Sequence, residues 1–405
     1  MTRRGTALAL GMALLLPAAA AGQEERPRVR DSGIVVGALP PGPANAITDV
    51  PGVKVGHATV IEGDSIRSGV TVIVPHAGNV FLQKVPAALH VANGFGKLAG
   101  VTQIRELGTI ETPIALTNTL AVGRVVDGLV RWTLDHTTID ARSVNAVVGE
   151  TNDGFLNAIT VPRVGADEVY AALAAAGGGP VAEGSVGAGT GTMALGFKGG
   201  IGTASRRVRI GDAVYTLGVL VQSNFGGALE IAGVQVGRAL GKADFLDEWM
   251  PAEGDSSSEW RPGDQPDAGG GSIMIVVATD APLDAHALER IARRAPYAIG
   301  RIGGFSSHGS GDYVIAFSSH PGVRVPHEAQ RLLAAREVLR GEALNPLFLA
   351  VIEATEEAIL NSLFRATTVT GWRGTAEALP LERVREILAR SGFPRPMGAK
   401  PEETP

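Results

Sequence analysis

The stretch Gly269-Gly-Gly-Ser-Ile-Met-Ile-Val-Val-Ala278 joins three glycines and a serine to an uninterrupted apolar run. Such a run, rich in β-branched residues, is typical of a strand that is buried on both faces. The glycines before it permit a strained turn, which would bring the carbonyl of Gly271 against the hydroxyl of Ser272. We therefore expect a buried strand that begins directly after a serine at the end of a glycine run.

A polar segment of unusual composition, residues 251–271, precedes this serine and is rich in Pro, Gly and Ser. A loop of that length inside a compact chain is typically functional or disordered. One interpretation is a linker between domains. The other is a flexible arm before a self-cleaving nucleophile, because cleavage would leave Ser272 with a free α-amino group, of pKa near ~8, as the base for its own hydroxyl. Composition alone leaves both open.

The periodicity of the remaining chain indicates a mixture of strands, hairpins and helices. Two strands are expected to form a hairpin across Gly211-Asp212, and Asn345 and Pro346 are expected to cap and begin a long helix. These features favour a layered α/β sandwich over strict β-α-β alternation, with a doubly wound sheet as the alternative. The expected strands are 53–60, 69–75, 143–149, 203–210, 213–222 and 273–278, and the expected helices are 120–133, 167–175, 284–299, 345–366 and 381–391.

Residues 1–22 have the pattern of a signal peptide. Arg3 and Arg4 precede the apolar run Ala7–Leu16, and small residues follow before Gln23. The run is too short to span a bilayer, so we expect cleavage and export to the periplasm, with no membrane attachment afterwards; retention as an anchor is the alternative. The chain has no cysteine and therefore neither disulfides nor a thiol nucleophile. Its net charge of −5, spread evenly, indicates no nucleic-acid partner.

Other catalytic and binding motifs are not found in the sequence. The glycine-rich run 187–202 contains Lys198 but not the order of residues that a phosphate-binding loop requires, so it is better interpreted as close backbone packing beside the cleavage site. The eight histidines do not form a His-Glu-x-x-His motif. No Gly-x-Ser-x-Gly elbow is present. We expect neither a metal nor a cofactor.

Several segments, in the same order along the chain, resemble the L-aminopeptidase/D-esterase-amidase family of DmpA type, which includes the β-peptidyl aminopeptidases. The similarity extends from about residue 43 to about residue 380. It implies an αββα four-layer sandwich with a self-processed, N-terminal-nucleophile-like fold, which assembles as a homo-oligomer of processed pairs. The segments that carry it are 45–57, 67–73, 187–193, 196–203, Gly271-Ser272 and 345–358.

The resemblance also implies roles for individual residues. Ser272 corresponds to the nucleophile, and cleavage after Gly271 would give chains 23–271 and 272–405 of one catalytic domain. Ser310 and Asp312 would support the nucleophile and its amino group, although some members have Glu in place of this Asp.

Three further positions would bind the substrate. Asn224 corresponds to the oxyanion-hole amide and Glu150 to the acid that binds the substrate ammonium group. Asn152 stands where some relatives have an aromatic hydroxyl residue, and we expect it in the pocket.

These assignments predict a self-cleaving serine aminopeptidase that acts through an acyl-enzyme on Ser272. Its substrates would be peptides, amino-acid amides or esters with a free N-terminus. One alternative is an acyltransferase of the ornithine acetyltransferase type, disfavoured because those enzymes use threonine as nucleophile. The other is a non-catalytic periplasmic binding protein, which would be expected to lack the nucleophile or its supporting residues.

Overall fold

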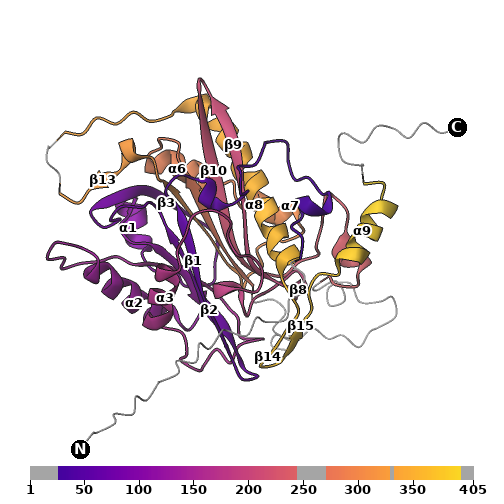
Figure 1. Ribbon diagram of the computed structural model, residues 1–405. Coiled ribbons are helices and arrows are strands. Elements are labelled where there is room, and N and C mark those ends of the chain that lie inside the picture. The colour runs from indigo at the N-terminus through magenta and orange to yellow at the C-terminus, as the bar shows by residue number, and fades with distance from the viewer. Residues whose placement is uncertain (1–25, 244–270, 329–332, 394–405) are drawn as a thin grey trace, which may run out of the picture.

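Two β-sheets lie face to face at the centre of the fold (Figure 1). The computed structural model describes residues 26–243, 271–328 and 333–393. The first sheet has the order β1-β2-β5-β6, with β5 and β6 parallel and the other pairs antiparallel. Its strands are β1 (Lys54–Glu62), β2 (Ile66–Val74), β5 (Ile114–Asn118) and β6 (Val147–Thr151).

The second sheet has the order β13-β3-β12-β11-β10-β9, and β4 pairs with β3 beside this path. Only β11 and β12 are parallel among these neighbours. The predicted hairpin across Gly211-Asp212 is confirmed, since Ala213 pairs with Ile210 and Gly211 has the positive φ of 59° that such a turn favours. The strands are β3 (Gln83–Gly94), β4 (Thr109–Ile110), β9 (Gly200–Ile210), β10 (Ala213–Asn224), β11 (Ser272–Thr279), β12 (Gly311–Ser318) and β13 (Val325–Pro326).

Helices cover the outer faces of both sheets. In Figure 1, α8 lies on the opposite side of the strands from α2 and α3. Two small hairpins, β7–β8 and β14–β15, complete the strands: β7 (Met193–Ala194), β8 (Phe197–Lys198), β14 (Val369–Gly371) and β15 (Gly374–Ala376). The α-helices are α1 (Val101–Leu107), α2 (Val122–Asp135), α3 (Ala166–Ala174), α4 (Val236–Ala239), α6 (Ala285–Ala292), α7 (Tyr297–Arg301), α8 (Asn345–Arg365) and α9 (Leu381–Arg390). Short 3₁₀ helices occupy Arg30–Ser32, Ile47–Asp49, Gly187–Gly189, Pro321–Val323 and Gly341–Leu344.

Three hydrophobic layers correspond to the three interfaces of a four-layer sandwich. Leu129 of α2 packs with Val72 under the first sheet. Between the sheets, Leu116 and Met274 belong to one cluster. Beyond the second sheet, Ile275 shares a cluster with α8. The predicted αββα sandwich is therefore confirmed.

Two details of the predicted helices are wrong. The helix expected over 284–299 is two helices, because Pro296 lacks the N–H of a helix interior and its ring would clash with a carbonyl one turn earlier. Asn345 is the first residue of α8, with helical φ −56° and ψ −43°, and not its cap. The 3₁₀ helix before it runs directly into α8, so Leu344 holds the cap position. Among the described residues, no helix is long and apolar enough to cross a bilayer.

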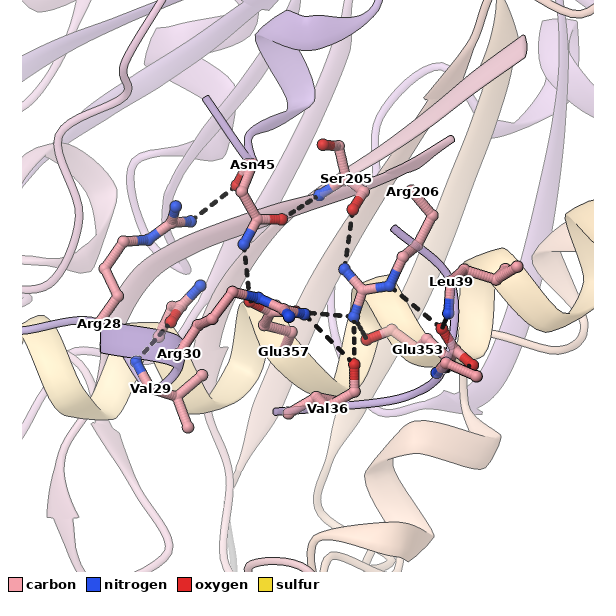
Figure 2. A network of polar contacts seen from close by, with 12 residues as sticks. Arg28, Val29, Arg30, Val36, Leu39, Asn45, Ser205, Arg206, Glu353 and Glu357 are labelled. Atoms are coloured by element: carbon pink, nitrogen blue, oxygen red, sulfur yellow. Dashed lines mark hydrogen bonds and ion pairs between the residues drawn. The ribbon is translucent and has the colours of Figure 1, made fainter. Parts of the chain in front are cut away.

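A buried network of ion pairs connects Arg30, near the start of the described chain, and Arg206 of β9 to α8 (Figure 2). Arg206 is fully buried and pairs through Nη2 with Oε2 of Glu357 at 2.7 Å and through Nε with Oε2 of Glu353 at 3.2 Å. Arg30 binds the same Glu357 oxygen at 2.7 Å. Burial raises the pKa of Glu357, but the two arginines outweigh it and hold that pKa below its usual value. The network joins residues on the two sides of the Gly271–Ser272 bond.

Candidate active site

Ser272, Asn224 and Gly311 lie on three neighbouring strands at one end of the second sheet. Ser272 is the first residue of β11, and its Cα is paired with Asn224 at the end of β10 and with Gly311 at the start of β12. Neighbouring strands lie about 5 Å apart, so Asn224 and Gly311 lie one strand spacing to either side of Ser272. Residues far apart in the sequence thus meet at the predicted nucleophile.

Ser272 and Asn224 belong to the face of the sheet that looks toward the first sheet. Side chains alternate along a strand, and Met274 and Gln222, two residues along from each, face inward. The Gln222 side chain donates to the carbonyl of Thr117 at 3.0 Å and to the hydroxyl of Thr151 at 2.8 Å. The site therefore lies between the sheets, with Ser272 only 4% exposed.

The carbonyl oxygen of Gly271 accepts two hydrogen bonds. The Ser272 hydroxyl donates to it at 2.6 Å, and the backbone N–H of Gly311 donates at 3.1 Å. A Cβ at position 271 would lie 2.7 Å from Cα of Phe225, so the close approach of the two backbones requires glycine there. The Gly311 N–H is placed to stabilise negative charge on this oxygen.

The amide of Asn224 has its orientation fixed by the backbone. Its Oδ1 accepts from the N–H of Met193 at 2.9 Å, and a backbone N–H can only donate, so Nδ2 is the donating end of the amide that remains for another partner. Met193 begins the β7–β8 hairpin, whose turn residues Leu195 and Gly196 both have positive φ. Asn224 thus presents a fixed donor beside Ser272.

Ser310 and Asp312 flank the residue that pairs with Ser272. The Ser310 hydroxyl donates to Oδ1 of Asp312 at 2.5 Å, and Oδ2 of Asp312 is buried without a hydrogen-bond partner among the described residues. Burial raises the pKa of Asp312, and the hydrogen bond from Ser310 opposes that rise. In the described chain no hydrogen bond joins Ser310 or Asp312 to the Ser272 hydroxyl. Their connection to it runs through the backbone of the paired strands.

Glu150 lies near the end of β6 and is 2% exposed. Its Oε1 accepts from the N–H of Lys97 at 2.8 Å, and its Oε2 accepts from the Thr119 hydroxyl. Burial raises its pKa. Tyr313, which the sequence did not single out, lies beside it: a Cβ on Gly96 would be 3.0 Å from both Oε1 of Glu150 and the Tyr313 ring. The carboxylate is thus held in place by neutral donors.

Asn152 has a different position from the other predicted residues. It is exposed, and its Oδ1 accepts from the N–H of Gly154 at 2.9 Å. This bond closes a local Asx turn. No described contact brings Asn152 to Ser272 or Asn224, so its geometry is that of a turn residue.

Two buried ionisable groups near the site were not predicted as site residues. Lys198 is fully buried, and burial lowers its pKa to about 7. Asp153 accepts from the Ser68 hydroxyl at 2.6 Å and from Nδ2 of Asn157 at 3.0 Å, and burial raises its pKa to about 7. A lysine among glycines gives no sequence signal of burial, which is why Lys198 was missed.

Several predicted features lie outside what the structure describes. The signal peptide at residues 1–22 does, and so does the arm at 251–271 apart from Gly271. The described part of the chain has no group of three or more His, Asp or Glu side chains placed to hold a metal ion.

The chain is similar to curated and solved aminopeptidases over most of its length. The β-peptidyl aminopeptidase BapA of Sphingosinicella xenopeptidilytica is 41% identical, covering 96% of this chain and 97% of the relative. The solved L-aminopeptidase D-Ala-esterase/amidase of Ochrobactrum anthropi, described as a prototype serine aminopeptidase with a variant of the Ntn hydrolase fold, is 37% identical with a TM-score of 0.79, over 91% of this chain and 99% of that chain. A solved Burkholderia β-aminopeptidase is 39% identical with a TM-score of 0.80, over 91% and 99%.

These matches agree with a site that holds a buried serine, a buried amide and a buried carboxylate, those of Ser272, Asn224 and Glu150. They confirm the predicted resemblance and the N-terminal-nucleophile type of fold. The pattern of peptidase family S58 matches residues 45–377. The chain therefore belongs to peptidase family S58, a family of aminopeptidases.

Proposed function

We propose that this aminopeptidase cleaves itself between Gly271 and Ser272 and then uses Ser272 as an N-terminal nucleophile. The observation that carries the proposal is the environment of the Gly271 carbonyl, whose oxygen accepts from the Ser272 hydroxyl and from the N–H of Gly311. Nucleophile, scissile carbonyl and oxyanion donor are thus adjacent in the intact chain.

Self-cleavage would proceed as an acyl shift. The Ser272 Oγ attacks the carbonyl carbon of Gly271, the C–N bond breaks, and the hydroxyl proton ends on the nitrogen of Ser272. The N–H of Gly311 stabilises the oxyanion formed on the way. Water then hydrolyses the Gly271 ester, which frees the Ser272 hydroxyl beside a new α-amino group. The buried, unpartnered Oδ2 of Asp312 is available to orient that amino group.

Turnover would repeat the chemistry on a substrate. The α-amino group of Ser272 accepts the hydroxyl proton as Oγ attacks the substrate carbonyl, and the Nδ2 group of Asn224 donates to the oxyanion. The proton passes to the leaving amine, an acyl-enzyme remains on Ser272, and water releases the acid. Glu150 binds the free ammonium group of the N-terminal residue, which restricts cleavage to that end.

The substrates we propose are peptides, amino-acid amides and esters with a free N-terminus. The relatives named β-peptidyl aminopeptidases support including β-amino-acid substrates. Hydrolysis of an amino-acid p-nitroanilide by purified protein tests the assignment. Ser272→Ala should abolish both self-cleavage and turnover, whereas Ser310→Ala should slow both. Turnover that persists in Ser272→Ala would contradict a nucleophilic role for this residue.

We also propose that residues 1–22 direct export to the periplasm and that the processed pair forms a homo-oligomer. The basic and apolar pattern of residues 1–22 supports the first statement. Cell fractionation with N-terminal sequencing tests export, and light scattering on a size-exclusion column tests assembly. A mature protein that keeps residues 1–22 in the cytoplasm, or elutes as a single pair, would contradict the corresponding statement.

A further inference from the structure

Lys198, at the end of β8, is a fully buried lysine in the glycine-rich segment for which the reaction provides no role. Its side chain has 0% exposure, and its Nζ donates to the carbonyls of Gly189 and Gly199, both at 2.8 Å. Burying an amine costs free energy, which hydrogen bonds only partly offset. An apolar side chain of similar length would fill the same volume without that cost. A lysine here requires an explanation beyond packing.

The two carbonyls that Lys198 binds lie at opposite ends of one loop. Gly189 O also accepts from the Thr192 hydroxyl at 3.1 Å, and the N–H of Gly199 donates to Thr192 O at 3.1 Å. Lys198 therefore closes the loop around Thr192. The next residue, Met193, donates the N–H that orients the Asn224 amide at 2.9 Å.

The same loop is held from its other side by the segment that follows Glu150. A Cβ on Gly191 would lie 2.8 Å from Cβ of Asp153, so the loop passes directly against that residue. Burial lowers the pKa of Lys198, and the charge of Asp153 acts in the opposite direction. The loop is thus confined between Asp153 and Asn224, with the Lys198 amine inside it.

We propose that Lys198 is a positioning residue for the oxyanion hole: by fixing the carbonyls of Gly189 and Gly199, it holds the Met193 N–H and through it the amide of Asn224. This inference rests on the proposed function, in which Asn224 stabilises the oxyanion. Lys198 touches neither substrate nor Ser272 in this assignment. Its effect must therefore pass through Asn224, which distinguishes it from a lysine that merely stabilises a loop.

A double-mutant cycle tests the proposal on the full-length protein. Lys198→Met keeps the length and apolar volume of the side chain and removes both hydrogen bonds. We expect kcat for an amino-acid p-nitroanilide to fall about tenfold with KM within about twofold, as small displacements of catalytic groups do. In an Asn224→Ala background the same change should lower kcat by less than about twofold, since the amide that it positions is gone.

The matched control is Lys242→Met, the same change at an exposed lysine that packs against Gly196 of the same hairpin. It should leave kcat unchanged. If Lys198→Met does not fold, Thr192→Val replaces it in the cycle, because it removes the other side-chain hydrogen bond to Gly189 O. A tenfold loss that persists in the Asn224→Ala background would overturn the inference and leave the proposed function intact. An unchanged kcat in Asn224→Ala alone would overturn both.

Discussion

The proposed role of Glu150 predicts that the enzyme distinguishes free from blocked N-termini. Glu150 is 2% exposed, and its two hydrogen-bond donors, the N–H of Lys97 and the hydroxyl of Thr119, are both neutral. Among the described residues no cation is hydrogen-bonded to this buried carboxylate, so it is available to pair with the ammonium group of a substrate. A charge-assisted hydrogen bond of this kind contributes roughly 1.5–3 kcal/mol, which corresponds to about tenfold to a hundredfold in kcat/KM.

Glu150→Gln tests the contribution of this charge-assisted hydrogen bond, because it removes the negative charge of the side chain. Glutamine keeps the shape, and its amide can satisfy both Lys97 and Thr119, so the site should remain folded and self-cleavage should remain intact. We expect the preference for an amino-acid p-nitroanilide over its N-acetyl form to fall by the same tenfold to hundredfold. Glu111→Gln is the matched control, because Glu111 is also buried but has its own partner in Lys84; it should leave the preference unchanged.

The assay is the ratio of kcat/KM for the free and acetylated substrates. Burial raises the pKa of Glu150, so the preference should also decline as the pH falls through a pKa above the usual glutamate value. Equal rates on the two substrates with the unaltered enzyme would refute the reasoning, as would a preference that survives Glu150→Gln.

Three further changes have expected outcomes. Asn224→Ala should lower kcat by ~10²-fold or more and leave KM nearly unchanged, because an oxyanion donor acts in the transition state; a rise in KM alone would place Asn224 in the pocket wall. Glu357→Gln should lower the free energy of unfolding by about 3 kcal/mol in urea denaturation, because it removes a charged partner of the buried Arg206. The control Glu386→Gln, in an exposed ion pair, should change that free energy by less than 1 kcal/mol. Equal effects of the two substitutions would contradict a stabilising role for the buried pair. Burial lowers the pKa of His57 to about 4, below the ordinary histidine value of about 6.5. As the pH falls below 6.5, the unfolded chain therefore protonates His57 before the folded protein does. The free energy of unfolding should then decrease between pH 6.5 and pH 4, by up to about 1.4 kcal/mol per pH unit. His57→Asn should flatten that profile, and an unchanged slope would argue against it.

The strand at Ser272 could be predicted because its signal is local. The apolar run after Ser272 has no polar interruption up to Ala278, and β11 is buried along its whole length. The partners of that strand could not be derived in the same way. Pairing of Ser272 with Asn224 and Gly311 is set by long-range register, so Asn224, Ser310 and Asp312 were assigned only through the family resemblance.

Some elements were missed for identifiable reasons. Strand β3 contains Pro86, which argues against a central strand. In the fold, Pro86 pairs only with Thr109 of β4, and the ladder with β12 begins at the next residue, Ala87. Strand β12 contains the run Tyr313–Phe317, whose apolar character was a usable signal. Lys198 was interpreted as part of a packed backbone loop, because nothing in the neighbouring glycine-rich sequence indicates that its amine is buried.

The intact mass of the purified, active protein tests the central claim most directly. The account predicts two fragments, and N-terminal sequencing of the smaller one should begin Ser-Ile-Met-Ile, from Ser272. Ser272→Ala should give one uncut chain under the same conditions. A single full-length species in folded, active protein would contradict self-cleavage and with it the assignment of Ser272 as an N-terminal nucleophile.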